Sequence, residues 1–122
     1  MYAIENLSIL PAHFVTVFLI SIVCLSMKMS RPKFSDKFYG YKTRLSLKNE
    51  TNWNEANRYC ANLSFIVGII FVTMDTLCYF FLKGPVSLII PLFIFGILVI
   101  GLMVVVEIHL ARFDKKLLNK IK

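Results

Sequence analysis

Two ionisable side chains, His13 and Asp75, interrupt long apolar stretches of this 122-residue chain. A charge at the centre of a bilayer costs at least about 2.5–3.5 kcal/mol on insertion scales, so such residues as a rule face a partner inside a bundle. A His13–Asp75 pair could line a polar pocket or relay a proton, because imidazole titrates near neutral pH. The alternative, which we favour, is a structural hydrogen bond or a protonated, neutral Asp75.

Polar and aromatic side chains are concentrated a second time between residues 38 and 58. Gly40 is expected at a turn with positive φ or at a close backbone approach. Arg44 and Arg58 could hold an anion, a lipid phosphate or a carboxylate through charge-assisted hydrogen bonds. The simpler interpretation, that this segment only caps helix ends with satisfied hydrogen bonds, stays open beside a role in recognition. The further donors and acceptors of the segment are Thr43, Ser46, Asn49 and Asn57.

Glu107 ends the last apolar run, at the same expected depth as Arg58. We therefore predict a Glu107–Arg58 ion pair that ties the polar segment to the tail of the chain. Glu107 and His109 do not form a metal-binding pair, because residues i and i+2 of a helix point to different faces. His13 and His109 are expected on opposite sides of a membrane. We therefore predict no Ser/His/Asp set, no catalytic or metal site and no cofactor.

Three long apolar runs must position these residues. The hydrophobic set makes up 57% of the chain and charged residues only 17%, whereas soluble domains are nearer 45–50% apolar. The runs are Ser8–Met27, Ala61–Leu82 and Pro85–Val106, and a helix needs about 20 such residues to cross a bilayer. Continuous rather than alternating hydrophobicity excludes β-barrel strands. No Lys or Arg precedes Ser8, so the first run lacks the basic region of a signal peptide and is expected to be retained.

We therefore predict an all-α membrane protein with a single domain over residues 1–122. The expected helices cover about 8–27, 52–82 and 85–110, and the spanning part of the second begins at residue 61. A structured loop joins the first two helices. Such a chain is a bundle of three transmembrane helices, since helices satisfy their own backbone groups in lipid.

Local signals refine these helices. Asn52 and Glu55 have the spacing of a capping box at the start of the second helix. Pro91 is expected to kink the third. Ser64 and Gly68 form a small-xxx-small pair suited to close helix packing and to association of chains as a homo-oligomer. An inner aromatic belt is expected from Tyr39, Tyr41, Trp53 and Tyr59.

The distribution of Lys and Arg predicts the orientation. Eight lie between residues 28 and 58 and five follow residue 111, whereas none precedes the first run and only Lys83 separates the last two. The positive-inside rule then places the N-terminus outside, with the loop and the C-terminus in the cytoplasm. These charges are expected to contact anionic headgroups of the plasma membrane, which leaves no basic face for a nucleic acid.

The polar segment also carries a pattern of fixed spacing, G-[YF]-[RK]-T-x-x-S-x-x-N-x-x-x-W-x-x-A-N-R, and meets it at ten positions. In this pattern the chain resembles the SdpI family of bacterial integral membrane proteins, in a short three-helix form. The resemblance extends from about Lys33 to the tail, and we call residues 28–58 the signature loop. The matching residues are Gly40, Tyr41, Lys42, Thr43, Ser46, Asn49, Trp53, Ala56, Asn57 and Arg58.

The resemblance implies a function of the immunity type. In that family a membrane protein protects a toxin-producing bacterium from its own secreted peptide and holds a cytoplasmic transcriptional repressor at the bilayer. The implied partners are therefore membrane lipids, a secreted toxin peptide and a repressor. An alternative from another class is a small membrane enzyme or carrier whose polar site is formed by the signature loop and Glu107.

Overall fold

Three long helices make up most of the chain. The computed structural model describes residues 2–34 and 40–122. All three helices are long and apolar enough to cross a membrane, and no strand occurs among the described residues. The prediction of an all-α membrane protein is therefore confirmed. The elements are a short 3-10 turn η1 (Leu7–Ile9), α1 (Leu10–Met29), α2 (Glu50–Phe81) and α3 (Val86–Ile121).

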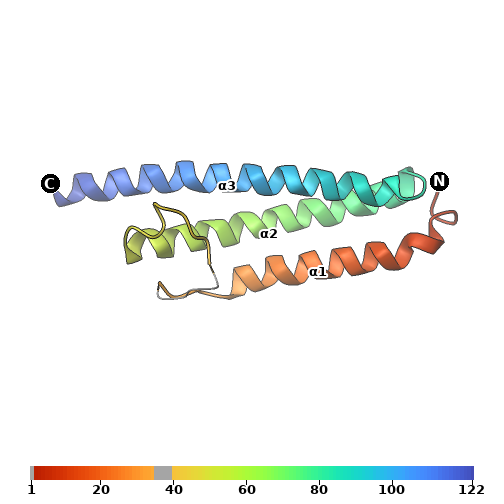
Figure 1. Cartoon of the computed structure of the whole chain (residues 1–122), viewed down its shortest axis with the longest axis horizontal. Coiled ribbons are helices and arrows are strands. Elements are labelled where there is room, and N and C mark those ends of the chain that lie inside the picture. The colour runs from red at the N-terminus through yellow and green to blue at the C-terminus, as the bar shows by residue number, and fades with distance from the viewer. Residues whose placement is uncertain (1, 35–39) are drawn as a thin grey trace.

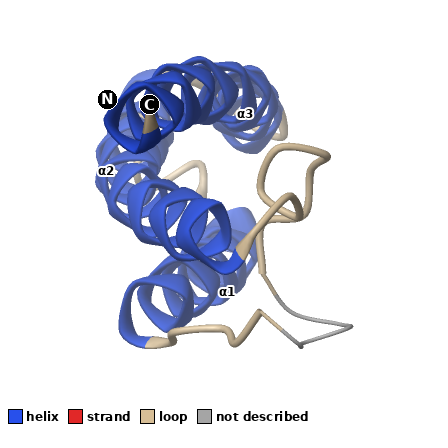
Figure 2. Ribbon diagram, turned by 90° about the vertical axis from the view of Figure 1, so that its left-hand side faces the viewer, coloured by secondary structure: helices blue, strands red, loops and turns tan. Residues whose placement is uncertain are grey.

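The helices run side by side, with α2 between α1 and α3 (Figure 1 and Figure 2). A tight turn at residues 82–85 joins α2 to α3, and Gly84 adopts a φ of 66° in it. We call this the turn end of the bundle. The opposite end carries the described part of the signature loop, and we call it the loop end.

Small residues let α1 approach α2 closely. A Cβ atom added to Gly68 would lie 3.1 Å from both the Cβ and the Sγ of Cys24. Ser64, one turn earlier on the same helix, is buried. The close packing predicted from the Ser64–Gly68 spacing is therefore present, and it joins α1 to α2 within one chain.

The start of α2 differs from the predicted capping box. The helix begins at Glu50, and the side chain of Asn49 accepts a hydrogen bond from the backbone N–H of Asn52 at 2.7 Å. Asn49 is therefore the N-cap residue. The prediction that Asn52 caps the helix is wrong, because Asn52 is already the third helical residue and its side chain is buried.

The third helix extends well beyond its predicted end at residue 110. It has 36 residues, which corresponds to roughly 54 Å at 1.5 Å per residue. A hydrocarbon core is only about 30 Å thick, so the last turns of α3 project out of the bilayer, past the beginning of α2 (Figure 1). Leu110 and Asp114 are buried there, because the signature loop packs against them.

Candidate functional site

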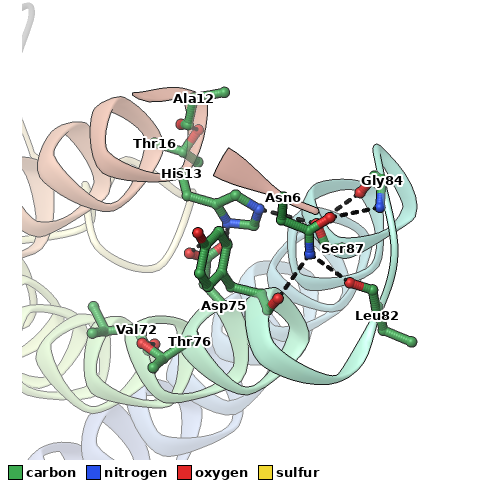
Figure 3. A network of polar contacts seen from close by, with 11 residues as sticks. Asn6, Ala12, His13, Thr16, Val72, Asp75, Thr76, Leu82, Gly84 and Ser87 are labelled. Atoms are coloured by element: carbon green, nitrogen blue, oxygen red, sulfur yellow. Dashed lines mark hydrogen bonds and ion pairs between the residues drawn. The ribbon is translucent and has the colours of Figure 1, made fainter. Parts of the chain in front are cut away.

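The turn end of the bundle holds a buried polar network with one residue from each helix. His13 Nδ1 lies 3.0 Å from both carboxylate oxygens of Asp75, and His13 Nε2 lies 3.1 Å from Ser87 Oγ (Figure 3). His13 is 4% exposed and Asp75 3%. The predicted pairing of His13 with Asp75 is confirmed, and its burial and complete partnering favour the structural interpretation.

Counting the hydrogens of this network indicates which ring nitrogen of His13 is a donor. Ser87 Oγ donates its single hydrogen to the carbonyl of Gly84 at 2.7 Å. It can then only accept from His13, so Nε2 must carry a hydrogen. The contact of Nδ1 with Asp75 needs one further hydrogen, and both an imidazolium facing a carboxylate and a neutral ring facing a carboxylic acid supply it. The three side chains are therefore satisfied by one another and by Gly84.

The order Asp75–His13–Ser87 is that of a serine-hydrolase triad, a set that the sequence predicted to be absent. The prediction rested on the separation of His13 from His109, and Ser87 carries no motif of its own. The geometry nevertheless lacks a free nucleophile. Ser87 is completely buried, its hydroxyl hydrogen bonds Gly84, and a nucleophilic serine must give that hydrogen to the histidine.

Asn6 completes the turn end. Its side-chain N–H groups donate to the carbonyls of Tyr79 at 2.8 Å and Leu82 at 2.7 Å, and its oxygen accepts from the N–H of Gly84 at 2.8 Å. The asparagine thus attaches the segment before α1 to the α2–α3 turn (Figure 3). Sequence reasoning missed Asn6, since all three partners are backbone groups that any residue provides.

An apolar pocket of about 250 Å³ lies beside this network, between α1 and α2. His13 and Asp75 are its main polar lining. An apolar side chain fits such a pocket, because its walls are aliphatic and aromatic. Those walls include Leu10, Phe14, Val17, Tyr79 and Phe80.

At the loop end, Gly40 and Trp53 show why the signature requires these two residues. Gly40 has a φ of +119°, and an added Cβ would lie 2.7 Å from two ring atoms of Trp53. The expectation of positive φ and of a close approach is confirmed. Trp53 is fully buried and donates its indole N–H to the carbonyl of Pro32 at 2.9 Å.

Two further signature residues satisfy the backbone around Tyr41. The Tyr41 N–H donates to Asn57 Oδ1 at 2.6 Å, and Asn57 in turn donates to the carbonyl of Trp53. Ser46 Oγ donates to the Tyr41 carbonyl at 3.0 Å and accepts from the N–H of Thr43 at 2.7 Å. These polar side chains thus hold irregular backbone in place, as buried backbone groups require.

Tyr41 links the signature loop to α3. Its hydroxyl lies 2.9 Å from Glu107 Oε1 and 3.2 Å from the carbonyl of Met103. Burial of the phenol, the hydrogen bond to Glu107 and the negative charge of that residue all raise the pKa of Tyr41. The phenol therefore stays protonated and acts as a donor to the carboxylate.

The predicted Glu107–Arg58 ion pair is wrong. Arg58 pairs instead with Glu55, three residues earlier on α2, with N···O distances of 3.0 and 2.6 Å. Glu55 also lies 2.8 Å from His109 Nε2, and the His109 ring stacks on Tyr59 at 3.9 Å. Equal depth does not place two residues on facing sides of their helices, and the nearer Glu55 takes the guanidinium.

A second attachment to α3 is formed by Asp114, which sequence reasoning did not single out. Asp114 accepts from Lys48 Nζ at 2.7 Å and from Asn52 Nδ2 at 2.9 Å.

The aromatic belt is also different from the prediction, because Trp53 and Tyr41 are buried in the loop packing. Tyr39 lies outside the described residues, and the predicted site residues Lys42 and Arg44 are exposed.

Residues 35–106, more than half of the chain, match the SdpI/YfhL protein family. The chain belongs to the SdpI/YfhL family. It is similar to a protein named uncharacterized protein YfhL from Bacillus subtilis (strain 168), with 39% identity over 59 residues. This match covers 48% of the chain and 54% of that relative, so the chain spans about half the length of the relative. No solved structure matches the chain.

The SdpI/YfhL match includes most of the described signature loop, α2 and the first part of α3, but not α1. Asp75 and Ser87 therefore lie inside the matched residues and His13 outside them. Within the matched part, Gly40, Trp53 and Asn57 build the fold of the loop. Tyr41 is the residue of the pattern that attaches this loop to α3.

Proposed function

We propose that the chain is an immunity protein of the SdpI type that binds or senses a membrane-active peptide and protects the cell that secretes it. The observation that supports this most is the attachment of the signature loop to α3 by Tyr41–Glu107 at 2.9 Å. A connector between two spanning helices does not need such an attachment. A sensor does, because packing changes in the membrane must move an element outside it.

The turn end offers a place for the peptide in this proposal. The apolar pocket beside His13 and Asp75 accepts an apolar side chain, and the charge distribution predicts that this end faces outward. A peptide that enters the outer leaflet reaches the pocket without crossing the bilayer. Its binding alters the packing of α1 on α2, in which Gly68 and Cys24 are in close contact.

The loop end offers the output. The projecting turns of α3 expose Lys115, Lys116 and Lys120, beside the loop that Asp114 attaches. A basic surface of this kind attracts an acidic face of a cytoplasmic protein. We propose that a transcriptional repressor is held there, as the family resemblance implies.

The test measures protection. A sensitive bacterial strain that produces the chain is challenged with the secreted toxin peptide of an SdpI-type system, and survival and membrane depolarisation are recorded. We expect the wild-type chain to protect and Tyr41→Phe to lose most of the protection, since only the hydroxyl on Glu107 is removed.

Tyr59→Phe is the matched control, because the ring of Tyr59 stacks on His109 at the same end of the bundle and keeps that contact without its hydroxyl. Membrane levels of all variants are compared by immunoblot. A wild-type chain that reaches the membrane but leaves depolarisation unchanged contradicts the proposal.

A further inference from the structure

A cavity of about 560 Å³ lies at the loop end, on the side of the bundle where α1 ends beside the first half of α2. Its volume falls within the range of about 300–1,000 Å³ that small-molecule sites occupy. Among the described residues, three cations line it, Lys28, Arg31 and Arg58, and no carboxylate does. The cavity is therefore positively charged and is distinct from the polar network at the turn end.

The three cations are held to different degrees. Lys28 Nζ donates to Asn62 Oδ1 at 3.1 Å and lies 5.0 Å from the centre of the Phe65 ring, contacts that position the ammonium without neutralising it. Arg58 is neutralised by Glu55, because its Nε and Nη2 groups donate to the two carboxylate oxygens of Glu55. Arg31 is exposed and forms no ion pair within residues 2–34 and 40–122. The cavity therefore keeps a net positive charge.

The depth of the cavity decides which anion it meets. Met29 ends α1, and the apolar run of α2 begins at Ala61, which is one of the residues that line the cavity. The cavity thus spans the level at which the chain changes from apolar to polar. Phospholipid phosphates lie at this level, and long basic side chains extend to it from the apolar region.

We propose that this cavity binds the phosphate headgroup of an anionic phospholipid. Basic pockets between spanning helices at this level bind such headgroups. The guanidinium of Arg31, which has no ion-pair partner among the described residues, offers two parallel hydrogen bonds to phosphate oxygens, and Lys28 adds a second charge. A zwitterionic headgroup fits less well, because its own ammonium group would meet these cations. The proposal does not depend on the immunity function.

The test uses the purified full chain in a neutral detergent. Binding of phosphatidylglycerol and of phosphatidylcholine is titrated by native mass spectrometry, at two salt concentrations. We expect phosphatidylglycerol to bind more tightly and Arg31→Gln to weaken it about five- to tenfold, as expected for one lost contact to a headgroup phosphate. Arg112→Gln is the matched control, since Arg112 is an exposed arginine near the same end of the bundle, outside the cavity lining.

Two outcomes would overturn the proposal. If Arg112→Gln weakens binding as much as Arg31→Gln, the lipid responds to overall charge and not to this cavity. If inorganic phosphate competes at the same concentration as phosphatidylglycerol, the cavity is a phosphate site but not a lipid site. Should Arg31→Gln fail to fold, Lys28→Gln replaces it, and an unchanged affinity in that variant equally overturns the assignment.

Discussion

His13 of α1 and Asp75 of α2 form a hydrogen-bonded pair from which solvent is almost excluded, with Nδ1 3.0 Å from both carboxyl oxygens. Ser87 of α3 accepts the other ring N–H at 3.1 Å. The three spanning helices therefore share one polar centre, although α1 packs mainly on α2. A buried pair of this kind adds little net stability but makes the loss of one partner costly.

Replacing Asp75 with Asn should lower folding yield more than it lowers specific function. The substitution removes the carboxyl group that the buried His13 ring contacts, at a cost of about 1–3 kcal/mol for a buried polar group left without its partner. Thermal unfolding in detergent and the amount of protein in the membrane measure this. Thr76→Val, which removes a hydroxyl bonded only to the preceding turn, should change little. Normal levels of Asp75→Asn with protection abolished would show instead that the pair is the functional site.

Replacing Gly40 with Ala should destabilise the loop end by about 1–3 kcal/mol. An alanine at this position would have to adopt a φ of +119°, which is a strained conformation for a residue with a side chain. Its Cβ would also lie 2.7 Å from the Trp53 ring. Gly96→Ala in α3 is the control, since a Cβ there meets nothing within 4 Å. That variant should be stabilised by about 0.5–1 kcal/mol, as expected for Gly to Ala inside a helix. The resistance of the loop to protease cleavage is measured in both variants. Equal resistance would show that the loop does not require glycine at residue 40.

Tyr41 and Glu107 should be coupled, whereas Arg58 and Glu107 should not. A hydrogen bond to a charged group is worth about 1.5–3 kcal/mol, so the cycle of Tyr41→Phe, Glu107→Gln and the double variant should give a coupling energy of that size. The free-energy changes of Arg58→Gln and Glu107→Gln should add up in their double variant, because Arg58 is hydrogen-bonded to Glu55. Additivity in the first cycle would mean that the phenol does not attach the loop to α3.

The predicted orientation can be tested with introduced thiols. Cys24, Cys60 and Cys78 are all buried, so the native background should be low, and Cys78 should react from outside only, if at all. Lys83 lies in the α2–α3 turn with a side chain 68% exposed, and Lys83→Cys should react with an impermeant reagent in intact cells. Leu47→Cys, at a position 49% exposed in the loop, should react only after permeabilisation. The reverse pattern would invert the topology.

The helices could be predicted because a bilayer demands long continuous apolar runs, and few other structures satisfy that demand. The His13–Asp75 pair could be predicted because two isolated ionisable groups at equal depth have few other partners. The same reasoning from equal depth gave a wrong partner for Arg58, because depth does not determine which side of a helix Arg58 and Glu107 occupy. Arg58 pairs instead with Glu55, which lies three residues earlier on the same helix.

Other parts of the site had no sequence signal. The side chain of Asn6 bonds only backbone groups, and Ser87 is one of many serines until the fold brings it to His13. The extension of α3 to Ile121 was also not predicted, because the apolar run that indicates this helix in the sequence ends at the edge of the bilayer. What continues the helix is a contact outside the membrane, from Asp114 to Lys48 and Asn52.

Because α3 is one continuous helix, a small tilt at one of its ends gives a large displacement at the other. Ser87 touches the polar centre at one end, and Asp114 holds the signature loop roughly 40 Å further along the same helix at 1.5 Å per residue. A tilt of only about five degrees around Ser87 displaces Asp114 by roughly 3–4 Å over that arm, which exceeds the length of a hydrogen bond. A slight rearrangement at one face of the bilayer is thus amplified into the making or breaking of contacts at the other, with no change inside the helix itself.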